Sequence, residues 1–169
     1  MKFVDESGVS ISMTRLYGRA EGGQRVVDSV HSNCGENLSI IGALSSTGIS
    51  AAMTISGPVD GDAFLAYVKR ILVPTLTAGD IVVMDNYNVH KMAVIRKAIR
   101  RAKASILFLP PYSPDLSPIE LCWSKIKSFL RSKESRSFLL LQDAISDAFS
   151  SISSSDILGW FNHSGYFFP

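Results

Sequence analysis

The order of apolar segments predicts an α/β fold with a central mixed sheet flanked by helices. Strand-like segments come first in the chain, and helical and strand-like segments then alternate. Hydrophobic residues make up 46% of the chain and charged residues 19%, which is typical of a folded globular protein. With 169 residues, the chain is expected to form a single domain over residues 1–169.

The first half of the chain is predicted to form strands. Lys2 to Asp5 is a short apolar strand, and Gly8 to Leu16 alternates apolar and polar residues as a further strand does. Residues 17–36 are rich in glycine and charge and predict a loop. Leu38 to Leu44 and Ile49 to Ile55 are expected to form a hairpin, because a short Gly-containing turn separates them.

The second half is predicted to contain four helices and two strands. The helices are expected at residues 63–72, 91–103, 118–132 and 138–152, where apolar residues recur at helical spacing, and the strands at 81–85 and 105–109. The expected buried side of the second helix is Ala93, Val94, Ala98 and Ile99, and that of the fourth is Leu140, Leu141, Ala144, Ile145, Ala148 and Phe149.

The sequence predicts a cytoplasmic protein without a membrane segment. No stretch approaches the roughly 18 consecutive apolar residues of a membrane span, and the first residues have no signal-peptide pattern. Cys34 and Cys122 form no CxxC pair and are expected to be buried thiols in a reducing compartment.

Two strand-like segments end in an acid, Asp5 after Phe3 and Val4, and Asp85 after Val82 to Met84. If these strands are parallel neighbours, both carboxylates face one crevice at the carboxyl ends of the strands. Oxygen ligands without His or Cys suit Mg²⁺ or Mn²⁺. An acid after a strand is also common as a turn or helix cap, so neither aspartate alone decides between the two interpretations.

Glu120 also has two interpretations. Ser117, Pro118 and Glu120 have the spacing of a helix capping box. Glu120 equally shares one helical face with Lys127 and Arg131, as expected of a helix that handles a phosphodiester.

Basic residues are concentrated in residues 91–136, which contain 11 of the 17 Lys and Arg residues against three acids. This local excess of positive charge is consistent with a surface that binds a polyanion. It is equally consistent with ordinary solvated helix faces.

In combination, these segments resemble the mariner-like transposases, most closely the bacterial insertion sequence 630 family. The segments that carry the resemblance are Val82 to Asn86, His90-Lys91 and Pro110 to Glu120, and 34 residues lie between Asp85 and Glu120, the spacing typical of that superfamily. Phe3 to Gly8 and Arg15 to Ala20 also resemble family segments, so that the likeness covers nearly the whole chain.

The resemblance implies a ribonuclease-H-like fold with a mixed five-stranded sheet. It implies that Asp5, Asp85 and Glu120 hold two Mg²⁺ or Mn²⁺ ions for cleavage and strand transfer of double-stranded DNA. It also implies cut-and-paste movement into TA dinucleotides, a homodimer and a bacterial, nucleoid-associated location. Such transposases carry upstream helix-turn-helix modules; we expect this chain to lack them and to rely on an upstream region or a separate reading-frame product.

Other residues of these segments are expected to have supporting roles. His90, Lys91, Lys127 and Arg131 are predicted to contact DNA, and a hydrogen-bonded structural role is the alternative for His90. Asn86 is expected to brace the turn after Asp85, Asp115 to fix the turn before the last acid, and Trp123 to lie in the core. Two other functions stay open, which are a non-catalytic remnant that binds DNA or dimerises, and another nuclease of the same fold.

Overall fold

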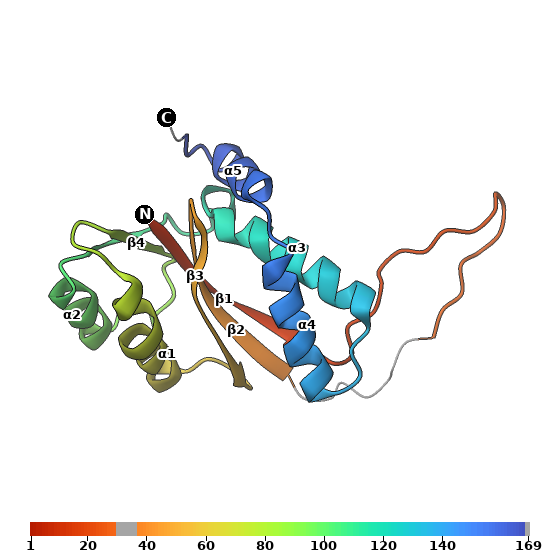
Figure 1. Ribbon diagram of the computed structural model, residues 1–169, viewed down its shortest axis with the longest axis horizontal. Helices are drawn as coiled ribbons and strands as arrows, with labels where there is room; N and C mark the ends of the chain where they lie inside the picture. Colours follow the sequence, from red (N-terminus) through yellow and green to blue (C-terminus); the bar gives the residue numbers. More distant parts are fainter. Residues whose placement is uncertain (30–36, 168–169) are drawn as a thin grey trace.

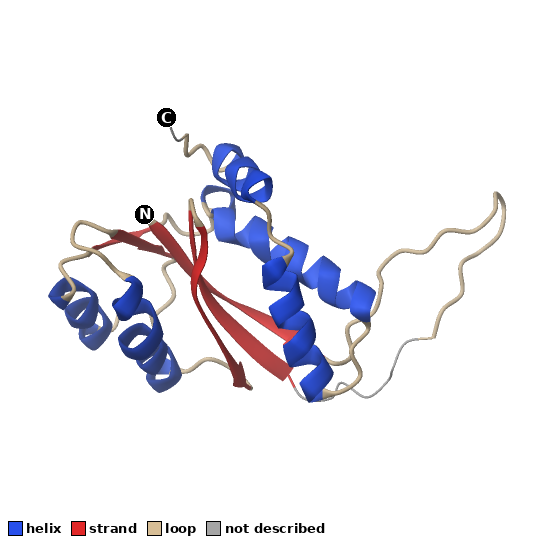
Figure 2. Ribbon diagram, in the orientation of Figure 1, coloured by secondary structure: helices blue, strands red, loops and turns tan. Residues whose placement is uncertain are grey.

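The computed structural model describes residues 1–29 and 37–167. Its centre is a five-stranded sheet in the order β3-β2-β1-β4-β5 (Figures 1 and 2). The first three strands pair antiparallel, whereas β4 and β5 run parallel to β1, so the predicted mixed five-stranded sheet is confirmed. The strands are β1 (Lys2–Ser10), β2 (Asn37–Ser45), β3 (Gly48–Ser56), β4 (Ile81–Met84) and β5 (Ser105–Phe108).

Two helical layers cover the sheet, and each encloses its own hydrophobic core (Figure 1). Because successive residues of a strand point to opposite faces, Phe3 belongs to one core and Val4 to the other. One layer contains α3 (Pro118–Lys133), α4 (Phe138–Ser150) and α5 (Ser154–His163). The other contains α1 (Gly61–Tyr67), the π-helical turn η1 (Val68–Leu72), the short 3-10 turn η2 (Val73–Thr75) and α2 (Ala93–Arg101).

The predicted strand from Gly8 to Leu16 is wrong. The first strand instead continues without a break to Ser10, because each residue from Phe3 to Ser10 pairs with a residue of β2. β1 ends at Ser10, whose partner Asn37 is the first residue of β2, and residues 11–16 form no strand. Residues 17–29 contain no helix or strand, as predicted, while residues 30–36, with Cys34, lie outside the described residues.

The helix predictions are confirmed in number and position up to residue 152, with two differences. The first helix changes from α-helical to π-helical geometry at Val68, before Pro74. A fifth helix, α5, was not predicted, because the serines that precede it resemble a turn. Ser153 and Asp156 form a capping box there and start the new helix, whose Phe161 is fully buried.

The buried faces of two helices differ from the prediction. In α2 the side chains that face the sheet are Ile95 and Ile99, whereas Val94 is 46% exposed. In α4 Leu140 is exposed, although Leu141, Ala144, Ile145 and Ala148 are buried as predicted. In each helix the buried face contains residues four positions apart, Ile95 and Ile99 in α2 and Leu141 and Ile145 in α4. The apolar residue that directly precedes each set points away from the core.

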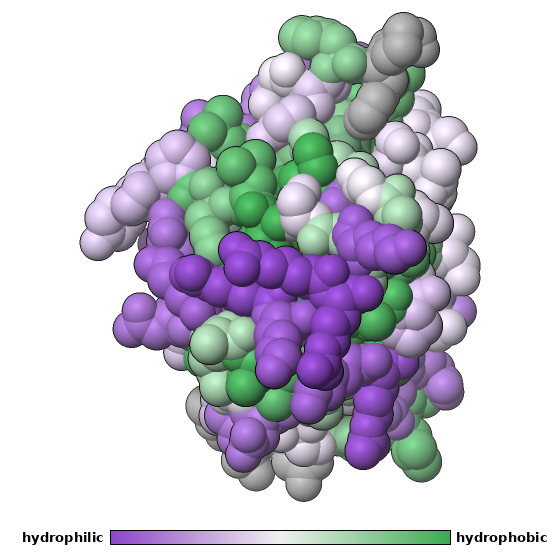
Figure 3. Space-filling view, turned by 90° about the vertical axis from the view of Figure 1, so that its left-hand side faces the viewer, coloured by the Kyte–Doolittle hydropathy of each residue, from purple (hydrophilic) through white to green (hydrophobic). Residues whose placement is uncertain are grey.

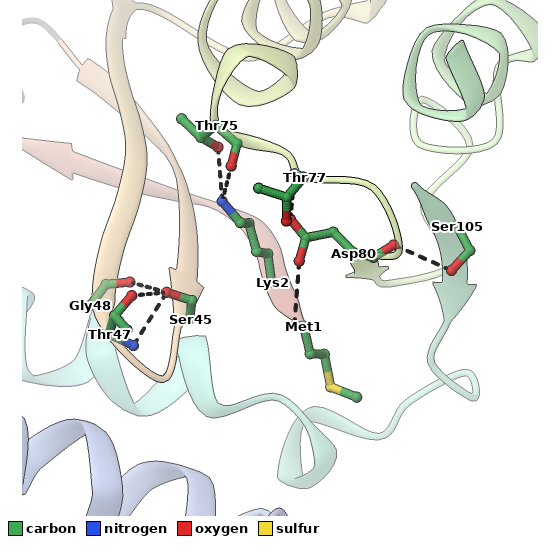
Figure 4. A network of polar contacts seen from close by, with 9 residues as sticks. All are labelled: Met1, Lys2, Ser45, Thr47, Gly48, Thr75, Thr77, Asp80 and Ser105. Atoms are coloured by element: carbon green, nitrogen blue, oxygen red, sulfur yellow. Dashed lines mark hydrogen bonds and ion pairs between the residues drawn. The ribbon is translucent and has the colours of Figure 1, made fainter. Parts of the chain in front are cut away.

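The amino ends of β1 and β4 are held together by a local polar network (Figure 4). The buried Lys2 donates from Nζ to the carbonyl oxygen of Thr75 at 2.5 Å. Asp80 accepts the backbone N–H of Thr77 at 2.8 Å, and this bond holds the pKa of its carboxyl below the usual range. This edge of the sheet therefore serves to anchor the strands. In the part of the chain that the structure describes, no helix has the length and apolar character to cross a membrane.

Candidate active site

Asp5, Asp85 and Glu120 line one cavity of about 510 Å³ at the carboxyl edge of the parallel strands. Asp5 belongs to β1, Asp85 follows β4, and Glu120 lies in the first turn of α3. Lys2 and Val82 are paired in parallel, which brings the two aspartates to the same edge of the sheet. The structure therefore brings together the three acids that the sequence singled out.

The cavity wall opposite the strand ends is the proline-rich turn that precedes α3. Pro110 to Pro114 line it, and Tyr112 is fully exposed with a positive φ of 56°. The capping-box interpretation of Glu120 is wrong, because the Ser117 side chain makes no capping hydrogen bond. Glu120 is exposed and faces the cavity, so its carboxylate is free to act there.

Trp123 holds the Asp5 carboxylate in place. Its indole Nε1–H donates to Asp5 Oδ2 at 3.0 Å, although the ring is only 3% exposed and belongs to the core, as predicted. Gly42, which pairs with Asp5 across the β1–β2 ladder, leaves room for this ring. A Cβ atom at Gly42 would lie 2.8 Å from the Trp123 ring carbon Cη2. The sequence predicted the burial of Trp123, but not its contact with an acid.

Asp5 is the acid with the most strongly altered ionisation. Burial raises the pKa of its carboxyl to about 7, and the charges of Glu6 and Glu120 act in the same direction. The Glu6 backbone N–H and the Trp123 indole only partly oppose this rise. No lysine or arginine among the described residues lines the cavity, so neither type of side chain offsets the negative charge there.

His90 bridges two acids from inside the protein. Its Nε2 lies 2.9 Å from Glu6 Oε1 and its Nδ1 lies 2.6 Å from Asp85 Oδ1, and the ring is 0% exposed. Asp85 Oδ1 also accepts the backbone N–H of Tyr87 at 2.9 Å. The predicted contact of His90 with DNA is therefore wrong, because the ring does not reach the surface, and the alternative structural role fits.

Glu6 is a site residue that sequence reasoning missed. It follows Asp5 directly in β1, so its side chain points to the opposite face of the sheet, where His90 begins the α2 layer. The site role of Glu6 was not predicted because it directly follows Asp5, and two successive acids after an apolar segment are typical of the polar end of a strand.

The other predicted residues take various positions. The Asn86 side-chain amide donates to the Leu109 carbonyl oxygen and so ties the ends of β4 and β5, as expected. Asp115 is exposed in the short 3-10 turn η3 (Pro114–Leu116) and does not line the cavity. None of the three predicted DNA-contacting cations lines it either; these are Lys91, Lys127 and Arg131.

The metal-free protein is expected to lose stability as the pH rises from about 4 to above 7. Neutral Asp5 stabilises the fold below its unfolded pKa of 3.8, and this contribution is lost as the pH rises toward 7. Burial lowers the pKa of His90, but the hydrogen bond and charge of Glu6, with Asp85, outweigh it and raise the pKa. This second contribution is complete below 6.5 and is lost as the pH rises through the raised folded value.

Thermal unfolding in a chelator across this pH range checks both contributions. His90→Gln should flatten the upper part of the profile, and Asp5→Asn the lower part. A melting temperature that rises steadily to pH 8 in the native chain would contradict the expectation.

Within the described residues, no three His, Cys, Asp or Glu side chains are arranged as a preformed metal-binding cluster. The three acids share one cavity, however, and offer only oxygen donors, which hard divalent cations prefer. The donor set therefore fits Mg²⁺ or Mn²⁺, and their carboxylates would hold such ions.

The mixed five-stranded sheet between two helical layers, with acids at its carboxyl edge, defines a class of protein by its fold, the ribonuclease-H-like proteins. Among solved structures, the Mos1 mariner paired-end complex with Mn aligns with a TM-score of 0.81 at 15% identity, over 96% of this chain and 52% of that chain. The pre-cleavage Mos1 transpososome aligns with a TM-score of 0.68 at 14% identity, over 99% and 56%. The catalytic domain of Mos1 mariner transposase aligns with a TM-score of 0.64 at 12% identity, over 99% and 83%.

These likenesses confirm the predicted ribonuclease-H-like fold. The chain spans about half the length of the Mos1 chains in the paired-end complexes. A search of curated protein sequences finds no match. The sequence model of the DDE superfamily endonucleases matches residues 1–141, and the chain belongs to this family.

Proposed function

We propose that this chain is the catalytic domain of a DNA transposase, which cleaves DNA and transfers strands with two divalent metal ions. The observation that carries the proposal is the shared cavity of Asp5, Asp85 and Glu120. Membership of the DDE superfamily endonucleases and the fold of the Mos1 catalytic domain support it.

The charges of the site favour cation binding. The pKa of Asp5 is raised by burial and then by the carboxylates of Glu6 and Glu120, and a divalent cation would relieve this repulsion. When bound, Mg²⁺ or Mn²⁺ supplies Lewis-acid activation of a nucleophile and stabilises the charge on the leaving oxygen.

The protein's own groups hold the acids in position. Trp123 fixes Asp5 through its indole N–H, and His90 and the Tyr87 backbone N–H fix one oxygen of Asp85. The proline-rich turn and the first turn of α3 then set Glu120 opposite both aspartates. In this arrangement the chain orients three carboxylates on rigid elements, which limits the reorganisation needed when a phosphodiester binds.

The finer parts of the proposal rest on the family resemblance. They are insertion at TA dinucleotides, a homodimer, end recognition by upstream helix-turn-helix modules, and closeness to the insertion sequence 630 family. We further propose that Lys127 and Arg131, which are half-buried on α3, and Lys91 contact DNA phosphates. Double-stranded DNA is then the partner, as transposon end and as target.

The proposal is tested by incubating the purified chain with supercoiled DNA in Mn²⁺, in Mg²⁺ and in a chelator. We expect nicking only with a divalent cation, and no nicking by Asp85→Ala purified in the same way. Equal nicking by that variant would show that the activity does not depend on Asp85 and would overturn the proposal.

A second substrate, an RNA–DNA hybrid, distinguishes a DNA transposase from another nuclease of the same fold. Cleavage of an RNA–DNA hybrid at least as fast as of duplex DNA would favour another nuclease of this fold. Calorimetry that detects no Mn²⁺ binding, with DNA binding intact, would favour a non-catalytic remnant.

A further inference from the structure

The basic segment of residues 91–136 does not form one surface. The sheet separates its two halves, because α2 packs against η1 and β5 on one face, while α3 packs against α4 and α5 on the other. The half on α2 presents six cations, here called the α2 surface, and no acid occurs between residues 91 and 114. They are Lys91, Arg96, Lys97, Arg100, Arg101 and Lys103.

Within residues 1–29 and 37–167, the cations of the α2 surface form no ion pair with a carboxylate. Among the described residues, the lysines and arginines that form ion pairs are Lys125, Lys133 and Arg136, all at or beyond α3. Asp80 follows Gly79, whose backbone N–H donates to the Lys103 carbonyl oxygen after α2, and the Asp80 carboxylate already accepts two hydrogen bonds from Thr77. Figure 3, which looks at the side where α1 and α2 lie, shows a broad hydrophilic band across this face.

A hollow of about 400 Å³ lies beside α2, between the helix and the edge strand β5. Arg96 and Arg100 line it, together with Ser105 and Phe108. Arg96 stacks over the Phe108 ring at 5.4 Å from its centroid, so its guanidinium is held in place. Its Nε is buried and has no hydrogen-bond partner in the described part of the chain. A guanidinium group held beside a hollow, with a second arginine lining the same hollow, matches a phosphate group.

The position of α2 connects this surface to the site. The turn that contains His90, bonded to Asp85, leads into the helix, and the nine residues of α2 extend roughly 14 Å away from it toward the start of β5. Duplex DNA carries one charge per about 1.7 Å along its axis, so a duplex on this face would meet the cations along the whole helix.

We propose that the α2 surface binds the phosphate backbone of duplex DNA outside the catalytic cavity, without reading its sequence. The inference rests on the proposed function for the identity of the polyanion. A duplex bound to the catalytic cavity would then also contact the α2 surface, which lies on the face of the sheet opposite α3.

The test compares Lys97→Gln/Arg101→Gln with the native chain, in the binding of a labelled duplex of mixed sequence in chelator at several salt concentrations. Both side chains are exposed, and neither belongs to the site. We expect binding to weaken roughly ten-fold at low salt, and the slope of log affinity against log salt to fall by about 2, since each lost phosphate contact contributes about 0.9.

The matched control is Lys125→Gln/Lys133→Gln, which removes the same two charges from side chains that pair with Asp156 and Asp147. It should leave the salt slope unchanged. An equal effect in both variants, an unchanged slope in the first, or binding to anionic lipid vesicles but not to DNA would overturn the inference.

Metal-dependent nicking at saturating DNA is measured in parallel. We expect it unchanged in Lys97→Gln/Arg101→Gln. If the salt slope falls as expected in Lys97→Gln/Arg101→Gln but the native chain does not nick DNA, the α2 surface is supported and the proposed function is rejected. Normal nicking with an unchanged slope would do the reverse.

Discussion

Asp5→Asn is expected to stabilise the metal-free protein and to abolish the proposed metal-dependent nicking of DNA. In the native chain, the buried carboxylate is ionised above pH 7 at a cost, since burial and the neighbouring charges of Glu6 and Glu120 raise its pKa to about 7. Asparagine keeps the shape and can still accept the Trp123 indole N–H, but it carries no charge. The free energy of unfolding at pH 8 should therefore rise by on the order of 2 kcal/mol.

The loss of activity should be far larger than this gain. A metal-bound transition state loses several kcal/mol of charge stabilisation when a ligand is removed, which corresponds to about a thousand-fold slower nicking. Denaturant unfolding in chelator and single-turnover nicking in Mn²⁺ measure the two effects.

The same variant should lose the stabilisation by metal. Mn²⁺ is expected to raise the melting temperature of the native chain at pH 8, because a ligand that binds only the folded state stabilises it. Asp62→Asn, at an exposed acid of α1, is the control and should respond to Mn²⁺ as the native chain does. An Asp5→Asn protein that is destabilised, or that still gains stability from Mn²⁺, would contradict the role given to Asp5.

Trp123→Phe is expected to weaken metal binding at neutral pH without unfolding the protein. The smaller ring keeps most of the core contact but removes the N–H that donates to Asp5 Oδ2 at 3.0 Å. That hydrogen bond lowers the pKa of Asp5, so its loss should raise the pKa further and leave less carboxylate to bind metal. Loss of a hydrogen bond to a charged group weakens the charged state by about 1.5–3 kcal/mol.

The readout is the pH dependence of Mn²⁺ affinity, measured by calorimetry. The midpoint should move to higher pH in Trp123→Phe, and affinity should recover toward the native value in alkaline buffer. A merely structural role would lower affinity equally at every pH. The control is Trp160→Phe, the other tryptophan, which packs at the edge of the same core and does not line the cavity.

The sequence was sufficient for much of the architecture. Strand and helix periodicity located β2 to β5 and α1 to α4, because alternation and helical spacing are local properties of the chain. It failed where pairing or packing decided the outcome. β1 continues across Gly8 because β2 is there to pair with it. Ile95 rather than Val94 is buried in the core beneath α2, because tertiary packing selects which side of the helix faces the sheet.

The three acids were recognised from the sequence, but each had an alternative explanation there. The parallel pairing of β1 with β4 brought Asp5 and Asp85 to one cavity. The absent capping bond of Ser117 left Glu120 available to it. The periodicity of the two strands did not specify this pairing, because the two aspartates lie far apart along the chain; only the family resemblance implied that they share a site.

What the sequence by itself determined is the family pattern, namely the acids, their spacing and the proline-rich turn before α3. What only the tertiary structure decided is the environment of each side chain. It placed His90 inside the protein between Glu6 and Asp85, and it set the Trp123 indole against Asp5. It also divided one basic segment between two faces of the sheet. Burial and proximity set the charge state and the accessibility of a group, and both depend on residues distant in sequence.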